Sequence, residues 1–287
     1  MRHRQLTLHD AASTLAVLKR MILDRINFDG RAVIVSGAGG GGIGSATCAA
    51  LAEVGARVIA VDINQQALDE LATQLEAMGA KFDCYTVDIC DTDQVEELMA
   101  ELDQSVGRVQ HLVNVVGGVR PQDWGPLEQA SEEQLEQVLN LNLEGAFRLS
   151  RRLAQRLIDA GESGSIVHVS SISAFFASER NGMYAIAKGG LEGMTRAMAV
   201  SWGGHGIRVN AIAPGRVNTP AIQARVDAGK MPGPEAFANK MPLGRTASPD
   251  EIAPPIVFML SDLAGYVTGQ SLLVDGGASV RFMITPD

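Results

Sequence analysis

The chain has 287 residues and a net charge of −9, and its 46% hydrophobic and 20% charged residues are typical of an ordinary globular protein. This acidic balance argues against nucleic acid or an anionic membrane as a general partner. No apolar run approaches the roughly 18 residues that span a bilayer, no signal region follows the basic start, and the odd number of cysteines fits a reducing compartment, so we expect a cytoplasmic protein.

The N-terminal segment, residues 1–27, is predicted to be a helical extension. Its apolar residues recur at helical spacing, with Leu15, Leu18 and Ile22 on one face. We expect this helix to pack on the domain or on a neighbouring subunit, with attachment to a membrane as the poorer alternative. Turn-forming residues 27–30 would end it.

A glycine-rich segment, residues 36–44, lies between a predicted strand and a predicted helix. The strand is the apolar run 32–35, and the helix continues to Glu53. In this order the bare backbone can approach a pyrophosphate, and the helix N-terminus presents free N–H groups and a positive dipole end. A flexible linker is the alternative, but a linker would not be held between a strand and an alanine-rich helix. We therefore predict a phosphate-binding loop.

Asp62 ends the second predicted strand, residues 57–61. A carboxylate at this place can accept hydrogen bonds from both hydroxyls of an adenosine ribose, and it would repel a 2′-phosphate. No arginine or lysine occurs in the glycine loop or directly after Asp62. The sequence therefore favours NAD over NADP, the alternative being an acidic residue that merely ends a strand.

Strands and helices are predicted to alternate through the rest of the chain. This regularity indicates an α/β fold, a single domain over residues 28–287 with one doubly wound parallel sheet flanked by helices. We find no internal repeat and no linker that would divide it. Three predicted helices cover 65–78, 92–106 and 131–160, a fourth contains Tyr184, and a fifth follows Ser248. The further predicted strands cover 82–87, 112–116, 166–169, 209–213 and 272–274.

Tyr184 and Lys188 lie four residues apart in one of these helices, which places one above the other on the same face. A nearby ammonium favours the phenolate and lowers the pKa of a tyrosine toward neutrality, where the phenol can donate and accept protons. The pair is a candidate acid/base device. A solvent-facing pair on an ordinary helix would look the same, so the interpretation depends on the other motifs.

The sequence from Phe28 to Gly277 resembles the short-chain dehydrogenase/reductase family in its compact single-domain form. The resemblance implies a Rossmann-type fold, a nicotinamide cofactor and an oxidoreductase that acts on a small molecule. Its motifs occur in the family's order and are the glycine loop, Asp62, Asp88-Ile89, residues 114–117, 142–145, Ser170-Ser171, the pair Tyr184 and Lys188, Pro214-Gly215 with Thr219, and residues 275–277.

Four catalytic roles follow from this resemblance. Tyr184 would exchange a proton with the oxygen of the substrate, and Ser171, which lies 13 residues before it, would hydrogen-bond the same oxygen. Lys188 would hold the hydroxyls of the nicotinamide ribose and lower the pKa of Tyr184. Asn142 would bind a water that links Lys188 to solvent.

The resemblance also implies a set of cofactor contacts. Asp62 and Ile63 would flank the adenosine, Asp88 and Ile89 the adenine, and Tyr184 and Lys188 the nicotinamide ribose. Asn114 and Gly117 would support the sheet edge beneath the cofactor, and Val217 and Thr219 would address the carboxamide. The remaining expected contacts are Gly37, Gly42, Ile43, Gly44, Pro214 and Gly215.

Two features depart from the family's pattern. Four residues separate Gly37 from Gly42 where the family usually has three, so we expect a rearranged turn near the pyrophosphate and leave open which of residues 39–41 touches it. The usual Asn-Asn-Ala-Gly is Asn114-Val115-Val116-Gly117 here, so one polar contact is expected to be lost. The histidines do not have the spacing of metal ligands, so we expect no metal site. Ser171 is not in the G-x-S-x-G turn of a hydrolase nucleophile, so we do not expect it to act as one.

Substrate choice is expected to depend on residues 118–124, 172–176, Met183 and a mobile lid over residues 219–245. The apolar side chains of that lid favour a hydrophobic or ring-bearing secondary alcohol or its ketone, although they could equally pack only on the domain. Alternatives are a reductase of 3-oxoacyl thioesters, an epimerase or dehydratase on the same scaffold, and a silent NAD-binding subunit.

The family commonly pairs through the helices that correspond to residues 132–160 and to the helix of Tyr184. We therefore expect a homo-oligomer, a homotetramer or a dimer. The apolar tail, residues 280–284, is expected to bury itself on a neighbouring subunit or over the active site.

Overall fold

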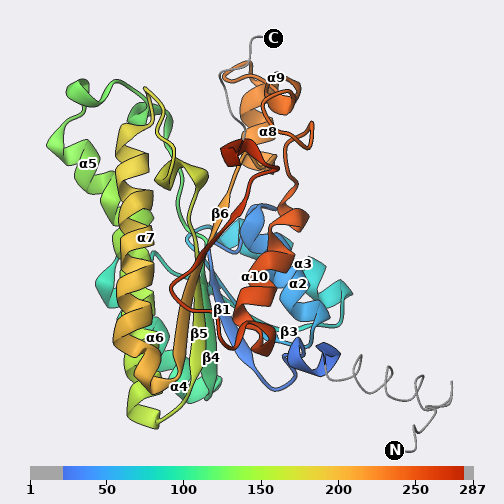
Figure 1. The fold of residues 1–287 in the computed structure, drawn as a ribbon. Helices are drawn as coiled ribbons and strands as arrows, with labels where there is room; N and C mark the ends of the chain where they lie inside the picture. The colour runs from blue at the N-terminus through green and yellow to red at the C-terminus, as the bar shows by residue number, and fades with distance from the viewer. Residues whose placement is uncertain (1–21, 281–287) are drawn as a thin grey trace, which may run out of the picture.

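The computed structural model describes residues 22–280, which form one parallel seven-stranded sheet with helices on both faces (Figure 1). The strand order is β3-β2-β1-β4-β5-β6-β7, and every neighbouring pair is parallel. The predicted single-domain, doubly wound Rossmann-type fold is confirmed. The strands are β1 (Ala32–Ser36), β2 (Arg57–Asp62), β3 (Lys81–Thr86), β4 (Val109–Asn114), β5 (Gly164–Val169), β6 (Ile207–Pro214) and β7 (Ser271–Val274).

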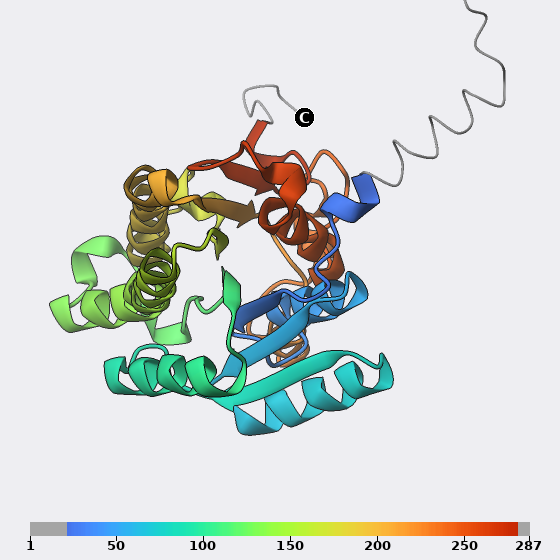
Figure 2. The same ribbon diagram turned by 90° about the horizontal axis from the view of Figure 1, so that it is seen from below.

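Two hydrophobic clusters hold the helices on the sheet. In β1, Val33 and Val35 point into one cluster, while Ala32 and Ile34 point into the other. The first cluster packs under α2 (Ile43–Glu53), α3 (Gln65–Ala77) and α10 (Ala253–Leu260), and the second under α4 (Thr92–Ser105), α6 (Gly145–Ala160) and α7 (Gly182–Trp202). Figure 2 shows the two helical layers. Because both faces of a strand are buried, the strand sequences are continuous apolar runs.

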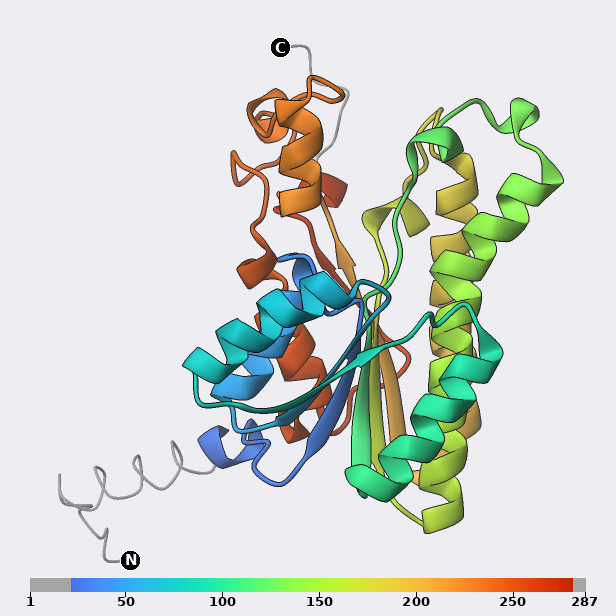
Figure 3. The ribbon, with the colours of Figure 1, turned by 180° about the vertical axis from the view of Figure 1, so that it is seen from behind.

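Three shorter helices lie beyond the carboxyl ends of the strands. They are α5 (Glu132–Leu139), α8 (Pro220–Asp227) and α9 (Glu235–Ala238). Figure 3 shows α8 and α9 on one side of this end of the sheet and α5 with the start of α7 on the other. The predicted lid, residues 219–245, thus contains α8 and α9.

The long helix predicted for residues 131–160 is interrupted. Ser131 caps it as expected, because its Oγ accepts the N–H of Gln134 at 3.1 Å while the side chain of Gln134 accepts the N–H of Ser131 at 3.0 Å. Residues 140–144 form a π-helical turn between α5 and α6. The turn surrounds Asn142, and such wide turns occur often at functional sites.

Two other element boundaries differ from the prediction. Strand β4 covers Val109–Asn114 and not residues 112–116, so Val115 and Val116 follow the strand as connecting residues. The helix predicted to follow Ser248 is a short 3₁₀ turn, Pro249–Glu251, and then α10 from Ala253. Prolines 254 and 255 cannot donate backbone hydrogen bonds, so they are tolerated only because they occupy the first turn of α10.

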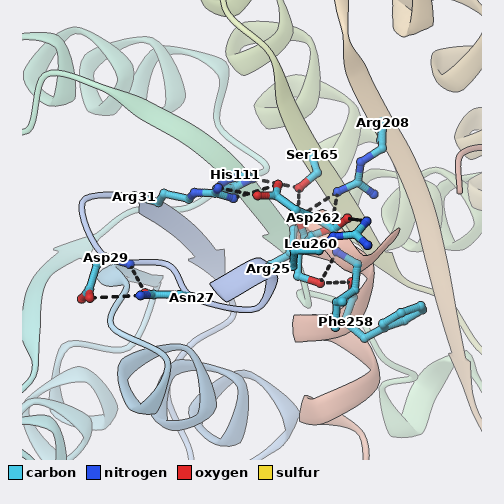
Figure 4. Close-up of polar contacts among 12 residues, drawn as sticks. Arg25, Asn27, Asp29, Arg31, His111, Ser165, Arg208, Phe258, Leu260 and Asp262 are labelled. Atoms are coloured by element: carbon cyan, nitrogen blue, oxygen red, sulfur yellow. Dashed lines mark hydrogen bonds and ion pairs between the residues drawn. The ribbon is translucent and has the colours of Figure 1, made fainter. Parts of the chain in front are cut away.

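A polar network at the amino ends of the strands joins distant parts of the chain (Figure 4). Arg31 forms two hydrogen bonds with the carboxylate of Asp262, at 2.6 and 3.0 Å, and Arg25 donates to the carbonyl oxygen of Asp262 at 2.6 Å. Arg208 donates to three successive carbonyl oxygens at the end of α10, residues 259–261, at 2.7 to 3.0 Å. These bonds fasten the start of the domain to its last helix.

Residues 22–25 are helical. The rest of the predicted N-terminal helix and the tail beyond residue 280 lie outside the described residues. Within residues 22–280, the hydropathy of no helix would allow it to cross a bilayer. The same part of the chain contains no group of three histidine, cysteine or acidic side chains arranged to hold a metal ion.

Candidate active site

A cavity of about 650 Å³ opens at the carboxyl ends of β1, β2, β4, β5 and β6. This edge is the switch point between β1 and β4, where open parallel sheets bind ligands. Sixteen of the expected site residues line it, and these are Gly37, Gly42, Ile43, Gly44, Asp62, Ile63, Asp88, Ile89, Gly117, Ser171, Tyr184, Lys188, Pro214, Gly215, Val217 and Thr219. Asn114 and Asn142 do not line it.

The glycine loop wraps one end of the cavity. Gly37 has a φ of +74°, and a Cβ there would lie 2.9 Å from the backbone nitrogen of Val116. A Cβ on Gly44 would collide with the carbonyl oxygen of Gly37. Gly39 and Gly40 line the cavity, whereas Gly41 faces Pro220.

The amino end of α2 is available for a ligand. Its N-cap residue, Gly42, makes no side-chain cap, and the first turn contains no acidic residue. The free N–H groups and the positive dipole end therefore face the cavity beside Ile43 and Gly44. A glycine-lined cradle and an uncapped helix end together fit the pyrophosphate of a dinucleotide.

Asp62 holds the loop in place. Its Oδ2 accepts the N–H of Gly39 at 2.9 Å, and its Oδ1 accepts the N–H of Asn64 at 3.0 Å. Among the described residues that line the cavity, Lys188 is the only lysine or arginine, and it comes from α7 on the other side of the sheet edge. The Asp62 end of the cavity is therefore negatively charged.

The wall after β3 consists of Asp88, Ile89 and Cys90. The carboxylate of Asp88 accepts the N–H of Cys90 at 2.8 Å, and the N–H of Asp88 donates to Gln94 at 2.9 Å. Ile89 packs so closely on α6 that a Cβ at Gly145 would lie 2.8 Å from its Cδ1. Burial and the nearby carboxylate of Asp88 raise the pKa of the Cys90 thiol to about 11.

Tyr184 and Ser171 come together at the wall of the cavity, from α7 and from the loop after β5. Burial raises the pKa of Tyr184 to about 12, and the nearby hydroxyl of Ser171 opposes this change. The Oγ of Ser171 also accepts the N–H of Ser173 at 3.1 Å, which fixes the hydroxyl against the 3₁₀ turn Ile172–Ala174.

Lys188 is fully withdrawn from solvent, with 2% of its surface exposed. Its Nζ donates to the carbonyl oxygen of Val169 at 2.9 Å and lies 5.7 Å from the centre of the Tyr184 ring. Burial lowers the pKa of Lys188 to about 8, and the charge of Glu192 acts in the opposite direction. The ammonium thus lies over the ring and is anchored to a carbonyl, and the expected lowering of the Tyr184 pKa by Lys188 is not found.

Asn142 supports the cavity from behind. Its Oδ1 accepts the N–H of Gly118 at 2.7 Å, and its Nδ2 donates to the carbonyl oxygens of Gly118 and Val138, each at 3.1 Å. A Cβ at Gly117 would lie 2.7 Å from Oδ1 of Asn142 and 2.9 Å from Nζ of Lys188. The glycine is therefore required for the close packing of these two side chains.

Asn114 lies at the end of β4, below the cavity floor. Its Nδ2 lies 3.0 Å from the hydroxyl of Ser150 and 3.1 Å from Nδ1 of His168. Burial lowers the pKa of His168 to about 3, so the imidazole is neutral. This contact ties β4 to β5 and α6.

The segment after β6 forms the remaining wall. Thr219 caps α8, because its Oγ1 accepts the N–H of Ile222 at 3.3 Å. Ala221 and Ile222 extend the cavity along this helix. Ala221 falls within the lid expected from the sequence, whereas Cys90 and Leu141 were missed as lining residues. Cys90 could have been found as the residue after Asp88-Ile89, but nothing in the sequence marks Leu141.

Comparisons with known proteins agree with this geometry. A family model described as enoyl-(acyl carrier protein) reductase matches residues 37–279. The chain is 36% identical over 252 residues to the 3-oxoacyl-[acyl-carrier-protein] reductase FabG of Thermotoga maritima, covering 88% of this chain and 99% of that protein. It is 34% identical to the D-threitol dehydrogenase of Mycolicibacterium smegmatis, covering 88% and 94%.

Solved structures extend the likeness. A gluconate 5-dehydrogenase from Burkholderia cenocepacia J2315, in complex with NADP and tartrate, superposes with a TM-score of 0.82 at 30% identity, covering 91% of this chain and 100% of that one. A 7α-hydroxysteroid dehydrogenase in complex with NADH and 7-oxoglycochenodeoxycholic acid gives 0.81 at 29% identity, covering 88% and 96%. The chain belongs to the short-chain dehydrogenase/reductase family.

Proposed function

We propose that this protein is an NAD(H)-dependent oxidoreductase that interconverts a secondary alcohol and its ketone. The observation that carries the proposal is the arrangement of one cavity. Tyr184, Ser171 and Lys188 lie together at one end, and Asp62 and an uncapped helix N-terminus lie at the other. An acid/base group and a dinucleotide cradle therefore share a single space.

The chain's own residues would manage the proton. A bound nicotinamide would supply or accept the hydride. Tyr184 carries its proton at neutral pH, since its pKa is about 12, and would give it to a ketone oxygen or accept one from an alcohol. Ser171, which lines the same end of the cavity, would donate to the same oxygen. Lys188 would hold the ribose hydroxyls, and Asn142 would help to order a water between Lys188 and solvent.

NAD is proposed in preference to NADP on the charge near Asp62. The carboxylate keeps lone pairs free for ribose hydroxyls while it holds Gly39 and Asn64. A 2′-phosphate would meet this charge, and of the described residues around the cavity only the distant Lys188 is a lysine or arginine. Asp88 and Ile89 would contact the adenine, and Val217 and Thr219 the carboxamide.

A hydrophobic or ring-bearing substrate is proposed from the surface around the Tyr184 end. Trp124, Phe175 and Phe176, in the loops after β4 and β5, are 39%, 44% and 50% exposed. Ala221 and Ile222 add apolar surface from α8. These three side chains are not among the residues that line the cavity, but exposed aromatic groups in the loops that follow Gly117 and Ser171 fit an apolar ligand with one reacting oxygen. Residues 219–245 would act as the lid over it.

A 3-oxoacyl thioester is the second candidate substrate. The similarity to the Thermotoga maritima reductase favours it, because that relative is matched over almost its whole length. The D-threitol relative represents a third, polar class. A panel should therefore contain steroid and cyclic secondary alcohols, a 3-oxoacyl thioester and small polyols.

The test is NADH formation or consumption, followed by near-ultraviolet absorbance, with each member of that panel. Turnover of apolar alcohols or ketones with NAD(H), lost in Tyr184→Phe, is the expected result. Turnover confined to polyols would refute the substrate class, and turnover confined to the thioester would favour the second candidate. Product formation without net change in NADH would indicate an epimerase or dehydratase. NADH binding without any reaction would indicate a silent subunit.

We also propose a cytoplasmic homo-oligomer, a dimer or a homotetramer. Phe147 on α6 and Ile186 and Val200 on α7 are 46%, 47% and 86% exposed. Apolar side chains on two neighbouring helices fit an interface between copies of the chain. Sedimentation at micromolar concentration should give a dimer or larger species, and a monomer alone would refute the proposal.

A further inference from the structure

A buried carboxylate lies on α7 one turn after Lys188. Tyr184, Lys188 and Glu192 follow one another at four-residue spacing, so the three side chains share one face of the helix. Only 4% of the surface of Glu192 is exposed. A carboxylate is rarely buried to this degree unless a partner stabilises it.

The two oxygens of Glu192 have different surroundings. The hydroxyl of Ser271, on β7, donates a hydrogen bond to Oε2. Oε1 has no hydrogen-bond partner among the described residues. One oxygen is therefore fixed to the edge of the sheet, and the other is buried without a hydrogen-bond donor among the described residues.

Lys188 is the cation next to Glu192 on this face of α7. Within the described residues, Tyr184 presents its ring to the ammonium, with 5.7 Å from Nζ to the ring centre, and Val169 presents a carbonyl oxygen at 2.9 Å. Burial and the charge of Lys188 lower the pKa of His168, on β5, to about 3, so its imidazole is neutral. Glu192 is the carboxylate whose charge favours the ammonium form against burial.

We propose that Glu192 is a positioning residue for the reaction, which keeps the ammonium of Lys188 charged and in place while Ser271 holds Glu192. This inference rests on the proposed function, because it assumes that Lys188 binds the ribose and assists Tyr184. It adds Glu192 on α7, and Ser271 on β7 which holds it, to the residues that support the proposed reaction.

Glu192→Gln tests the proposal, since it keeps the shape and removes the charge. Without that charge the pKa of Lys188 falls below its value of about 8, so the amine becomes neutral at a lower pH. The alkaline limb of the kcat profile should therefore move to lower pH by about one unit. Glu192→Asp should restore part of the shift, and Ser271→Ala, which leaves the carboxylate, should produce less of it.

The matched control is Glu97→Gln. Glu97 is exposed on α4, and its substitution changes the net charge by the same amount. It should leave the profile unchanged. A merely structural Glu192 would lower kcat equally at all pH values, or lower only the melting temperature, and either result would overturn the inference.

NADH binding gives a readout that does not require turnover. The titration is followed by fluorescence from about pH 6 to about pH 9, which spans the lysine pKa of about 8. As the pH rises, the affinity of Glu192→Gln for NADH should fall at a lower pH than the affinity of the wild type. Failure of the wild type to bind NADH would refute the proposed function. Binding with the same pH dependence in both proteins would refute the role of Glu192 and leave the proposed function intact.

Discussion

Replacing Asp62 by alanine should change the choice between NAD and NADP. Both carboxylate oxygens already accept backbone N–H groups, from Gly39 at 2.9 Å and from Asn64 at 3.0 Å, so the charge is held rigidly at the adenosine end of the cavity. Loss of one hydrogen bond from a ribose hydroxyl to a charged group costs about 1.5–3 kcal/mol, which lowers kcat/KM for NAD by about 10- to 150-fold.

The same substitution should favour NADP. A carboxylate and a 2′-phosphate about 5 Å apart repel each other by about 1–3 kcal/mol in a partly exposed site, so removing the carboxylate improves NADP use by about 5- to 150-fold. The ratio of the two kcat/KM values should therefore fall at least about 50-fold. The ratio is the quantity to compare, because the freed N–H groups of Gly39 and Asn64 loosen the loop for both cofactors.

The assay is steady-state kinetics with each cofactor, or the Kd of NADH and NADPH by fluorescence. Asp69→Ala is the matched control, since Asp69 is an exposed acid on the neighbouring helix α3 and should leave the ratio unchanged. An unchanged ratio in Asp62→Ala, or a wild type that prefers NADPH, would refute the reasoning about this carboxylate.

Four further outcomes are expected. Tyr184→Phe should lower kcat at least about 100-fold with NADH affinity retained, and full activity would contradict the assigned acid/base role. Lys188→Ala should weaken NADH binding and turnover together, and loss of turnover alone, measured beside an NADH titration, would place the lysine away from the ribose. Burial lowers the pKa of His111 and of His168 from 6.5 to about 3, so below pH 6.5 the unfolded chain takes up protons that the folded one does not. The free energy of unfolding should then fall by up to about 1.4 kcal/mol per pH unit for each histidine between those pH values, and urea titrations should show a smaller fall in His111→Gln. Leu149→Ala, at a fully buried site, should cost about 2–5 kcal/mol in the same titrations, and a cost below 1 kcal/mol, about the value for exposed sites, would contradict its place in the core.

The sequence predicted the order of strands and helices well, because burial on both faces of the sheet leaves long apolar runs such as 32–36. Most of the residues expected to contact a cofactor line one cavity, since parallel strands place their carboxyl ends at one edge. Boundaries were less accurate where the chain leaves the sheet: Val115 and Val116 are as apolar as the strand before them, and only the pairing of β4 shows that it ends at Asn114.

Other features depend on contacts between distant residues and were not predicted. The π turn contains Asn142, whose side chain accepts the N–H of Gly118 and donates to its carbonyl oxygen, and Gly118 lies 24 residues earlier. The pKa of Tyr184 depends on how deeply α7 is buried, and a spacing of four residues to Lys188 carries no information on that. The close approach of Gly41 to Pro220 likewise depends on where α8 lies, which the sequence of the loop does not indicate.

Gly41 and Pro220 limit how this enzyme scaffold could be redesigned. Gly41 has a φ of +66°, and a Cβ there would lie 3.0 Å from Cγ of Pro220, the first residue of α8. Shortening the loop by one residue, to give it the spacing usual in the family, would open a gap against α8, which lines the cavity with Ala221 and Ile222. A cofactor-binding loop grafted from a relative would therefore need a compensating change at the start of α8, and cofactor and substrate preferences would have to be engineered together.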